Sequence, residues 1–494
     1  MMLSALLQGF VTDLPPYAMP VAGLSLDHRQ LVPGEVFIAL QGTKAHGILY
    51  AQDAVVAGAI AVVYEPEGVD VLPKLAVPLI AVPNLANLLG EIAARFYQQP
   101  AKDLFVVGVT GTDGKTSVTH FISEALQVLG DKAAVLGTLG IGMPGRLQVA
   151  THTTPDAIRV QQHLHDLRQQ DFTALAMEVS SHALDQGRVN AVPFHTAVLT
   201  NLTRDHLDYH GTVEAYAEAK RRLFFWPGLR QVVLNLDDAF GQSIWRDLQH
   251  TDVQLSAYGV GDVDNYPPRS VMAKQVRFTQ AGIEAEIVTP VGAGLLRAPV
   301  LGQFNLHNLL ATLAVLLGKG IGLDDALNAL RQVKTVPGRM ERVQGPVGAA
   351  LTVVDYAHTP GALEQVLKAV RVHTTGRLLC VFGCGGDRDK GKRPLMAAVA
   401  ERLADQVIVT DDNPRTESPA SIFADIATGF AESAQLVFEH DRGKAIRWAI
   451  QQAGAGDTVL IAGKGHETVQ ILADRTVPFD DRAQASSALW ESAA

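Results

Sequence analysis

The most informative stretch of this chain is Val106-Val107-Gly108-Val109-Thr110-Gly111-Thr112-Asp113-Gly114-Lys115-Thr116-Ser117. A hydrophobic run over residues 104–109 ends there in a glycine-rich turn, and a helical pattern over residues 118–129 follows it. Backbone N–H groups of such a turn bind phosphate oxygens, the lysine neutralises the β- and γ-phosphates, and the Thr116 hydroxyl can bind Mg²⁺. The stretch therefore predicts a nucleoside triphosphate site.

The glycine spacing departs from the general phosphate-binding pattern. That pattern places four residues between its first Gly and the Gly-Lys pair, whereas Gly108 lies one residue too far from Gly114 and Gly111 lies too near. An ordinary glycine turn before a helix is the alternative. Because strand, turn and helix follow in the required order, we favour a compact phosphate loop over residues 111–116.

Composition and charge narrow the functional class. With 494 residues, of which 47% are hydrophobic, the chain is expected to form roughly three domains of about 150 residues. The net charge of -10 and the lack of a basic run argue against nucleic acid or an anionic membrane as the main partner. No apolar run approaches the roughly 20 residues that span a bilayer.

The cysteines and the N-terminus indicate the compartment. Cys380 and Cys384 lie close together, without further Cys or His at the spacing of a zinc site. Free thiols in a reducing compartment explain them most simply. The first ten residues lack a basic segment and are typical of a short amphipathic helix rather than of a signal peptide. We therefore expect a cytoplasmic protein.

The order of hydrophobic runs and turns predicts an α/β fold with three domains, residues 1–100, 101–332 and 333–494. In the first domain, strands are predicted at 36–40, 59–63 and 79–82, and helices at 51–58 and 85–97. In the second, strands are predicted at 104–109, 133–136, 174–179, 197–200 and 232–235. Residues 251–300 look β-rich, as an insertion or edge sheet, and helices follow at 308–317 and 323–331.

The third domain repeats the alternation of strands and helices, with strands predicted at 351–355, 378–382, 406–410 and 458–462. Such alternation favours a parallel sheet with helices on both faces. Ligands of open parallel sheets gather at the carboxyl ends of the strands. Each polar motif described below directly follows a predicted strand, so we expect these motifs to line the sites.

Two polar motifs and one lysine stand out in the second domain. Glu178-Val-Ser-Ser-His182 ends a buried strand, and Glu178 can bind Mg²⁺ through oxygen, although a strand-end capping cluster explains the motif equally well. The segment 201–211 contains Asp205, His206 and Asp208, which favours a metal or phosphate site. Lys220 lies in a plainly helical segment, and its spacing alone predicts a solvated surface lysine.

Four loops of the third domain carry charged residues, at 355–360, 383–394, 411–415 and 463–467. Loop 383–394 is not a dinucleotide fingerprint, because no glycine stands at the required third position. An arginine can hold a carboxylate with two hydrogen bonds, and Asp or Glu can hold an ammonium, so together the loops could recognise an amino acid. For each loop alone, an Asx or glycine-rich turn is about as good an explanation.

Taken together, six ordered motifs make the chain resemble the Mur ligase family over essentially its whole length. They are Gly111–Thr116, Glu178–His182, Asp205–Asp208 with Lys220 beyond, Asn305–Asn308, Pro337–Arg339 and Asp355–His358. Within the family, Thr153–Pro155, Asp412–Arg415 and Gly463–Glu467 resemble the members that add the third amino acid of the peptide.

The resemblance implies a small N-terminal α/β domain for the UDP end, a central P-loop-type parallel-sheet ATPase domain and a C-terminal Rossmann-like domain. It implies an ATP-dependent amide ligase of peptidoglycan biosynthesis. ATP would phosphorylate the γ-carboxylate of D-Glu in UDP-N-acetylmuramoyl-L-alanyl-D-glutamate. The amine of meso-2,6-diaminopimelate would then attack the acyl phosphate, giving the amide, ADP and phosphate. The domains are expected to close, because the ATP and amino-acid motifs lie in different domains.

The resemblance also implies ligands for ATP and Mg²⁺. The ATP ligands would be Gly111, Thr112, Asp113, Gly114, Lys115, Thr116, Ser117, Asn305 and Arg339. The Mg²⁺ ligands would be Thr116, Glu178, His206 and Lys220. Lys220 matches a lysine that the family carbamylates, which turns a cation into a carboxylate. The implied catalytic residues are Lys115, Glu178, His206 and Lys220.

Two further sets of residues follow from the same resemblance. The UDP-muramoyl dipeptide would contact Leu26, His28, Thr43, Lys44, Ala45, His152, Thr153, Thr154, Ser180, Gln186 and Arg188. The incoming amino acid would contact Arg388, Asp412, Asn413, Pro414, Arg415, Gly463 and Glu467. A guanidinium at Arg415 suits the distal carboxylate of diaminopimelate, which lysine and ornithine lack.

The chain departs from the family pattern at four positions. Asp113 stands where the family usually has Asn, and its charge would need an offsetting cation near phosphate. His28 replaces a serine of the first domain, His46 replaces an aspartate and His152 stands where Asn is common. None of the four touches the implied reaction centre, but His28 and His46 bear on the UDP site.

Several alternatives stay open from the sequence. A close variant would add lysine or ornithine, and a folylpolyglutamate-synthase-like ligase shares the central fold. A binding protein that responds to nucleotide without catalysis is the non-enzyme alternative, and the presence of Lys115, Glu178, His206 and Lys220 argues against it. The expected partners are small-molecule substrates alone, with neither nucleic acid nor membrane insertion, and the expected state is a monomer.

Overall fold

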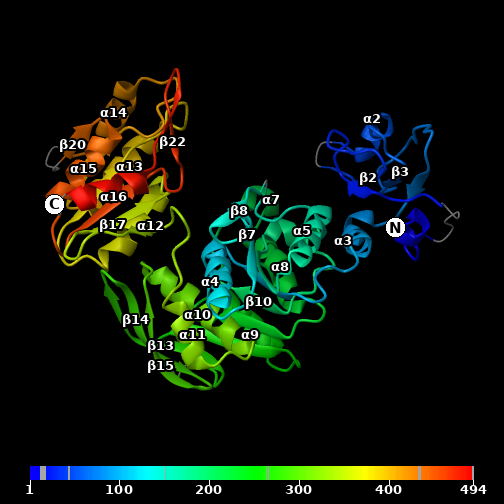
Figure 1. Cartoon of the computed structure of the whole chain (residues 1–494), viewed down its shortest axis with the longest axis horizontal. Helices are drawn as coiled ribbons and strands as arrows, with labels where there is room; N and C mark the ends of the chain where they lie inside the picture. The colour runs from blue at the N-terminus through cyan, green and yellow to red at the C-terminus, as the bar shows by residue number, and fades with distance from the viewer. Residues whose placement is uncertain are drawn as a thin grey trace. The chain divides into compact units, whose positions relative to one another are not determined.

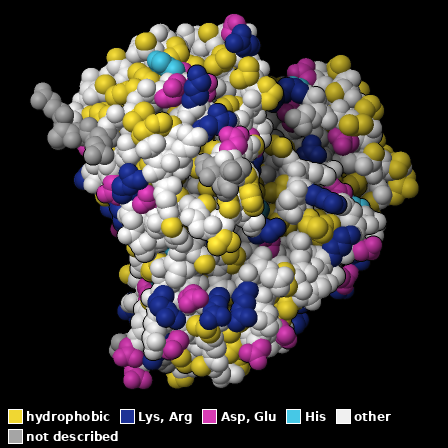
Figure 2. Space-filling view, turned by 60° about the vertical axis from the view of Figure 1, so that its left-hand side comes forward, with side chains coloured by type: hydrophobic (Ala, Val, Ile, Leu, Met, Phe, Trp, Pro, Cys, Tyr) yellow, Lys and Arg dark blue, Asp and Glu magenta, His cyan; other side chains and the backbone are white. Residues whose placement is uncertain are grey.

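The computed structural model describes residues 1–11, 18–42, 45–150, 152–262, 264, 266–431 and 436–491 (Figure 1). The chain forms two compact units, Met1–Ser256 and Ala257–Ala494. Within the described part, no helix has the length and apolar character needed to cross a membrane. Basic and acidic side chains are interspersed over the face that Figure 2 shows, as expected for a chain without a basic run.

The first unit begins with a four-stranded parallel sheet in the order β1-β2-β3-β4. Its strands are β1 (Gly23–Ser25), β2 (Glu35–Ala39), β3 (Ala61–Tyr64) and β4 (Leu79–Ala81). Alternate residues face opposite sides, so Val36 and Ile38 pack with α1 (Leu3–Leu7) and α3 (Leu85–Phe96), while Phe37 packs with α2 (Ala51–Val56). The three predicted strands are confirmed, and the three-residue β1 is too short to show in the sequence pattern.

A larger sheet of the first unit has the strand order β11-β10-β5-β9-β6-β7-β8. Its parallel strands are β5 (Phe105–Thr110), β6 (Ala133–Gly137), β9 (Ala174–Glu178), β10 (Thr196–Leu199) and β11 (Gln231–Asn235). The parallel strands are almost wholly buried, as both faces of the sheet are covered by helices. The helices of this region include α4 (Lys115–Val128), α5 (Ala157–Gln169), α8 (Val213–Arg221) and α9 (Ala239–Leu248). The predicted parallel α/β arrangement is confirmed.

An antiparallel hairpin that the sequence pattern did not predict extends the edge of this sheet. It consists of β7 (Gly140–Met143) and β8 (Arg146–Gln148). The glycines of β7 and the largely exposed residues of β8 give no alternation of apolar and polar residues, which is the pattern from which a strand is predicted.

The second unit begins with the β-rich segment that the sequence predicts. β12 (Gln254–Val260) crosses the boundary between the units, and β13 (Ser270–Thr279), β14 (Gly282–Thr289) and β15 (Gly292–Ala298) continue the sheet as an antiparallel meander. Two helices follow, α10 (Gln303–Gly318) and α11 (Leu323–Leu330). α10 begins five residues before its predicted start.

The second unit ends with a six-stranded sheet in the order β16-β17-β21-β18-β19-β20. Its strands are β16 (Glu341–Val343), β17 (Leu351–Asp355), β18 (Leu378–Phe382), β19 (Gln406–Thr410), β20 (Leu436–Glu439) and β21 (Thr458–Ala462). All pairs except β16–β17 are parallel. The helices are α12 (Pro360–Arg371), α13 (Lys392–Leu403), α14 (Pro419–Ala427), α15 (Arg442–Gln452) and α16 (Asp481–Glu491), and a hairpin joins β22 (Val469–Ile471) to β23 (Thr476–Pro478). Separate apolar cores lie on the two faces of the sheet.

Both cysteines are free, as the sequence predicts, and both are buried. Cys380 lies in β18, and the Sγ atom of Cys384 lies 3.8 Å from Sδ of Met396. Burial in apolar surroundings raises the pKa of each thiol to about 12. Neither thiol forms the reactive thiolate at neutral pH.

His120 makes the stability of the first unit sensitive to acid. It lies on the buried side of α4, and desolvation lowers its pKa to about 4. Between pH 6.5 and 4 the unfolded chain would bind a proton at His120 and the folded chain would not, so stability falls with falling pH. We expect the wild-type protein to lose about 3 kcal/mol of its free energy of unfolding between neutral pH and pH 4 through His120, and His120→Gln to lack this loss. Urea unfolding of both proteins across this range measures the difference, and equal slopes would contradict the prediction.

Candidate active site

The phosphate loop lies at the carboxyl end of β5, between that strand and α4. Gly111 and Gly114 both have positive φ, and a Cβ atom at Gly111 would lie 1.8 Å from Oγ1 of Thr200, so the loop requires glycine there. Nζ of Lys115 donates to the backbone oxygens of Gly111 and Thr112, at 2.9 Å each. The first turn of α4 leaves N–H groups available to phosphate oxygens.

Asp113, the departure from the family pattern, belongs to the loop through its backbone. Its N–H donates to Oδ1 of Asn201 at 3.0 Å, and its backbone oxygen accepts from Oγ1 of Thr200 at 2.6 Å. The residue itself is exposed. Thr200 and Asn201 follow β10, so the neighbouring parallel strand holds the loop in shape.

Glu178 is held beside Thr116 at the end of β9. Its Oε1 accepts from Oγ1 of Thr116 at 3.0 Å and from N of Thr138 at 2.8 Å. The carboxylate fits only because residue 137 is glycine, since a Cβ there would lie 2.1 Å from Oε1. Desolvation raises the pKa of Glu178, and its hydrogen bonds oppose that rise. Sequence reasoning missed Gly137 and Thr138, whose only signal is their place at the end of a predicted strand.

Lys220 is not the surface lysine that its spacing predicts, and that prediction is wrong. Only 1% of the residue is exposed, and Nζ donates to the backbone oxygen of Gly111 at 2.8 Å. Nζ also lies 4.5 Å from the ring centre of Tyr216, one turn earlier in α8. Desolvation, with a smaller effect of the Lys115 charge, lowers the pKa of Lys220 to about 6. Two lysines therefore meet at the Gly111 carbonyl, one of them with an easily neutralised amine.

His206 begins the short helix α7 (Leu207–His210) with a left-handed backbone, φ 52°. Its ring lies 4.9 Å from that of His182 and 6.1 Å from that of Tyr216. His182 belongs to α6 (Ser181–Asp185) and Tyr216 to α8, so rings from two helices pack against His206. The half-exposed His206 ring is thus packed between His182, four residues after Glu178, and Tyr216, four residues before Lys220.

The donor set fits Mg²⁺ in part. Thr116 and Glu178 offer the hydroxyl and carboxylate oxygens that this hard cation prefers. No group of three or more His, Cys, Asp or Glu side chains that could hold a metal occurs in the described ranges. The expected set includes only two such residues, Glu178 and His206. Lys220 offers only a nitrogen atom, so it can join a set of oxygen ligands only after modification to a carbamate.

Five residues of the expected dipeptide site lie together beside the β9 end. Oγ1 of Thr154 donates to the Glu178 backbone oxygen at 2.8 Å, and Nη1 of Arg188 donates to the Thr154 backbone oxygen at 2.9 Å. The other members are Thr153, Ser180 and Gln186. The hydroxyl of Thr153 bonds to that of Thr138, and Oγ of Ser180 accepts from the backbone at the start of α6. The side chain of Gln186 accepts from Arg188 and donates to Tyr209. Tyr209 was missed by sequence reasoning. His152 lies exposed just before Thr153.

The expected UDP residues lie in the N-terminal sheet region. The His28 ring stacks on Tyr50, with ring centres 4.8 Å apart and planes 8° apart, and Leu26 packs against the core. His46 is structural, because it accepts from Ile48 N at 2.9 Å and its Nε2 lies 3.0 Å from the Glu65 backbone oxygen. The Ala45 backbone oxygen accepts from Gly42 N, and Thr43 and Lys44 lie outside the described residues.

Two expected ATP ligands belong to the second unit. Asn305 is buried in α10, where Nδ2 donates to the Leu301 backbone oxygen at 2.7 Å and Oδ1 accepts from Asn308 at 2.9 Å. The Arg339 guanidinium lies 5.1 Å from the ring centre of Tyr356. Arg339 therefore stacks beside the loop that follows β17.

Loops after β19 and β21 bring most of the expected amino-acid ligands together. Nζ of Lys464 donates to Oδ1 of Asn413 at 3.0 Å and to Oε2 of Glu467 at 3.1 Å. A Cβ at Gly463 would lie 2.7 Å from Oδ2 of Asp412, so glycine admits that carboxylate. Asp412 is buried, and desolvation raises its pKa. Lys464 is fully buried and was missed, although it stands between the two glycines of the quoted motif.

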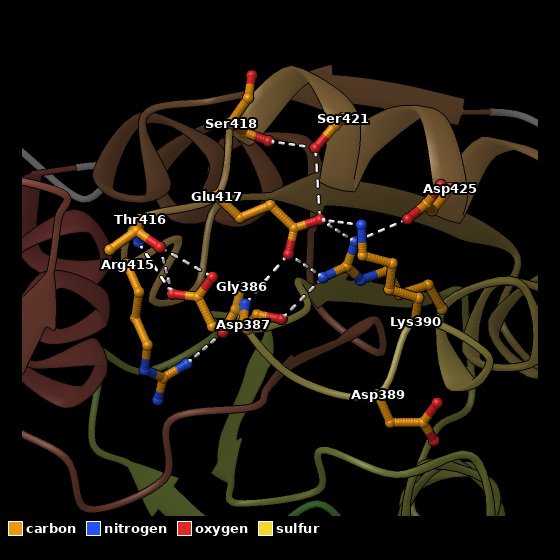
Figure 3. A network of polar contacts seen from close by, with 12 residues as sticks. Gly386, Asp387, Asp389, Lys390, Arg415, Thr416, Glu417, Ser418, Ser421 and Asp425 are labelled. Atoms are coloured by element: carbon orange, nitrogen blue, oxygen red, sulfur yellow. Dashed lines mark hydrogen bonds and ion pairs between the residues drawn. The ribbon is translucent and has the colours of Figure 1, made fainter.

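The side chains of Arg415 and Arg388 both lie near Gly385 of the loop after β18. Nη1 of Arg415 donates to the Gly386 backbone oxygen at 2.9 Å (Figure 3). A Cβ at Gly385 would lie 2.9 Å from Nη1 of Arg415 and 3.7 Å from Cγ of Arg388. Pro414 is buried just before Arg415. Within the part of the chain that the structure describes, Nε and Nη2 of Arg415 make no hydrogen bond. This edge of the guanidinium can therefore donate two hydrogen bonds to a carboxylate.

Models of three Mur ligase domains match the chain. The Mur ligase family catalytic domain matches residues 20–97, the Mur ligase middle domain residues 109–316, and the Mur ligase glutamate ligase domain residues 338–465. The chain is also similar to UDP-N-acetylmuramoyl-L-alanyl-D-glutamate–2,6-diaminopimelate ligases. It is 53% identical to that of Pseudomonas aeruginosa, over 95% of each chain, and 48% identical to that of Coxiella burnetii, over 95% of this chain and 96% of the other.

Solved structures agree with these matches. A structure of a UDP-N-acetylmuramoyl-L-alanyl-D-glutamate–2,6-diaminopimelate ligase has a TM-score of 0.80 and 38% identity, and covers 99% of this chain and 98% of its own. The folylpolyglutamate synthase of Mycobacterium tuberculosis shares the fold alone, with a TM-score of 0.57 and 16% identity over 76% of this chain and 91% of its own. The chain belongs to the Mur ligase family.

Proposed function

We propose that this protein is an ATP-dependent carbon–nitrogen ligase of peptidoglycan biosynthesis. It joins 2,6-diaminopimelate to the γ-carboxylate of D-Glu in UDP-N-acetylmuramoyl-L-alanyl-D-glutamate. Residues 1–100 would bind the UDP end, 101–332 ATP and 333–494 the amino acid. We place the reaction in the cytoplasm, because buried free thiols such as Cys380 and Cys384 suit a reducing compartment.

The observation that carries this proposal is the free guanidinium edge of Arg415 in a chain 53% identical to a diaminopimelate ligase. A distal carboxylate can accept two hydrogen bonds from Nε and Nη2. Arg388, which also lies near Gly385, adds a second positive charge. Lysine and ornithine have no distal carboxylate, so their binding would leave Arg415 without a partner.

The first step would transfer the γ-phosphoryl group of ATP to the D-Glu carboxylate. A carboxylate oxygen attacks the γ-phosphorus and ADP leaves. Loop residues 111–117 would bind the phosphates through backbone N–H groups, and Lys115, already directed at the loop, would neutralise charge on them. Thr154, Ser180 and Arg188 would orient the dipeptide beside Glu178.

Mg²⁺ bound through Thr116 and Glu178 would neutralise charge on the phosphates, and His206 and modified Lys220 would complete its ligands. The neutral amine of Lys220 can add to carbon dioxide. The N–C bond forms as one C–O π bond of CO₂ opens, and the nitrogen releases a proton to leave a carbamate. The low pKa of Lys220, about 6, keeps this amine largely neutral at pH 7.

The second step would form the amide. The amine nitrogen of the amino acid attacks the acyl carbon, phosphate leaves, and the nitrogen loses a proton. Asp412 and Glu467 present carboxylate oxygen atoms that can hold the other ammonium group in place, and Asn413 donates to Glu467. Fixed orientation of the amine supplies much of the rate enhancement in such a step.

Product mass and phosphate release test the proposal directly. The protein would receive ATP, Mg²⁺ and UDP-N-acetylmuramoyl-L-alanyl-D-glutamate, with diaminopimelate, lysine or ornithine in parallel. We expect a tripeptide product with diaminopimelate and at most about 1% of that rate with the other two, because a buried polar site rejects ligands that leave it unpaired. Product with lysine or ornithine would keep the ligase and overturn the amino-acid assignment, and no product with any of them would overturn the acceptor.

A further inference from the structure

Arg393 is a buried cation held by two carboxylates in the amino-acid region. It lies in the first turn of α13, and its side chain is fully buried. Nη1 donates to Oε1 of Glu417 at 2.8 Å and to Oδ2 of Asp425 at 2.7 Å, while Nη2 donates to Oε2 of Glu417 at 2.7 Å. A two-pronged pair of this kind fixes both partners in orientation as well as in distance.

Asp387 ties the loop after β18 to the same segment. Its carboxylate accepts from N of Thr416 at 3.0 Å and from Oγ1 of Thr416 at 2.9 Å (Figure 3). Its own N–H donates to Oε2 of Glu417 at 3.1 Å, and Nζ of Lys390 lies 3.1 Å from Oε1 of that residue. The two residues that directly follow Arg415 are therefore held by side chains from another loop.

Arg415 itself is held at both ends by backbone contacts. Its N–H donates to the backbone oxygen of Ile471 at 3.1 Å, and Nη1 donates to Gly386 O at 2.9 Å. Its φ of 52° is in the left-handed region, which a non-glycine residue adopts only where the surroundings compensate. The contacts of Thr416 and Glu417 supply that compensation.

We propose that Asp387, Arg393 and Glu417 form a positioning network that fixes Arg415 for the distal carboxylate of the amino acid. The inference rests on the proposed function and deepens it. None of the three residues needs to touch the substrate. They hold the backbone on which Arg415 stands and leave its Nε–Nη2 edge free.

Stability alone does not account for this placement. A buried ion pair is often no more stabilising than apolar residues of the same volume, because both charges lose their hydration. One carboxylate partner of Arg393 is Glu417, two residues after Arg415, and Arg393 also donates to the backbone oxygen of Gly385 at 3.2 Å. The network therefore contacts both the segment that follows Arg415 and the loop after β18, to which the Arg415 guanidinium is bonded.

The test compares Asp387→Ala with Asp389→Ala. Asp389 lies two residues away on the same loop and bonds to Gly391 N at 2.8 Å instead of to the network. We expect Asp387→Ala to lower kcat/KM for diaminopimelate by about tenfold through KM. We expect unchanged KM for ATP, unchanged residual activity with lysine, and wild-type values for Asp389→Ala.

Two further variants distinguish the positioning role of Asp387 from backbone strain and from an effect that does not act through Arg415. Asp387 has φ 54°, where Asn is better tolerated than Ala, so Asp387→Asn avoids backbone strain and should show a smaller effect of the same kind. In an Arg415→Ala background, Asp387→Ala should have no further effect on diaminopimelate kinetics, because the network acts through Arg415. Thermal unfolding of each variant reports whether the fold is retained.

The outcomes separate this inference from the proposed function. If the wild-type protein forms no product with diaminopimelate, the proposed function fails. If it does, and Asp387→Ala behaves like Asp389→Ala or raises the KM values for ATP and diaminopimelate equally, the positioning network is wrong. Additive effects of Asp387→Ala and Arg415→Ala would also overturn it.

Discussion

Replacing Lys220 by alanine is expected to reduce turnover by at least about a thousandfold, because the variant cannot form the carbamate that would help to hold Mg²⁺. In the structure, Nζ of Lys220 reaches the Gly111 carbonyl from a buried position. Its low pKa leaves a neutral amine at pH 7, which is the form that adds to carbon dioxide. Phosphate release with all three substrates measures the loss.

Rescue distinguishes the carbamate from a simple structural role of Lys220. Formate or acetate, supplied to Lys220→Ala, can place a carboxylate in the space left by the side chain and should restore part of the activity. Lys220→Arg is the matched control, since it keeps a long basic side chain but stays protonated and cannot form a carbamate. Near-normal activity of Lys220→Ala, or of Lys220→Arg, would contradict the role.

Replacing Arg415 by alanine should raise the KM for diaminopimelate by about a hundredfold, as two charge-assisted hydrogen bonds to the distal carboxylate are lost. The KM for ATP should change by less than about twofold, since Arg415 contacts the Gly386 loop of the C-terminal sheet. Initial rates with each substrate varied in turn give both constants. Arg415→Lys keeps the charge without the two-pronged geometry, so its KM for diaminopimelate should lie between those of the wild-type protein and Arg415→Ala.

Equal effects of Arg415→Ala on the KM values for ATP and diaminopimelate would remove Arg415 from the amino-acid site. A third result is also informative. If the variant gains activity with lysine while it loses activity with diaminopimelate, Arg415 acts mainly by rejecting substrates that leave its guanidinium unpaired.

The parallel sheets could be predicted because their strands are short, continuous apolar runs. β5, β9 and β19 stand out in this way, and the polar residues that follow them lie at the strand ends as expected. Strand register then brings Gly111, Glu178 and Asn201 to one edge, which no local pattern states. The hairpin β7–β8 was missed because its glycines and exposed residues carry no such pattern.

The burial of Lys220 illustrates what local sequence cannot supply. On α8 it follows Tyr216 by one turn and Ala219 by one residue, so the helix pattern fits either a solvated or a buried lysine. Only the packing of α8 against the phosphate loop decides between them. The charges of residues 387–393 and 415–417 were equally visible, but their pairing depends on the neighbouring β18 and β19.

The two buried thiols of β18 and the turn after it make the protein convenient for site-specific labelling. Maleimides and other alkylating reagents react with thiolates, and with a pKa of about 12 Cys380 and Cys384 should remain unmodified in the folded protein at neutral pH. Single cysteines introduced at exposed positions could then carry fluorophores without removal of the native residues. Such dyes would let energy transfer follow domain motion during a catalytic cycle of the otherwise native chain.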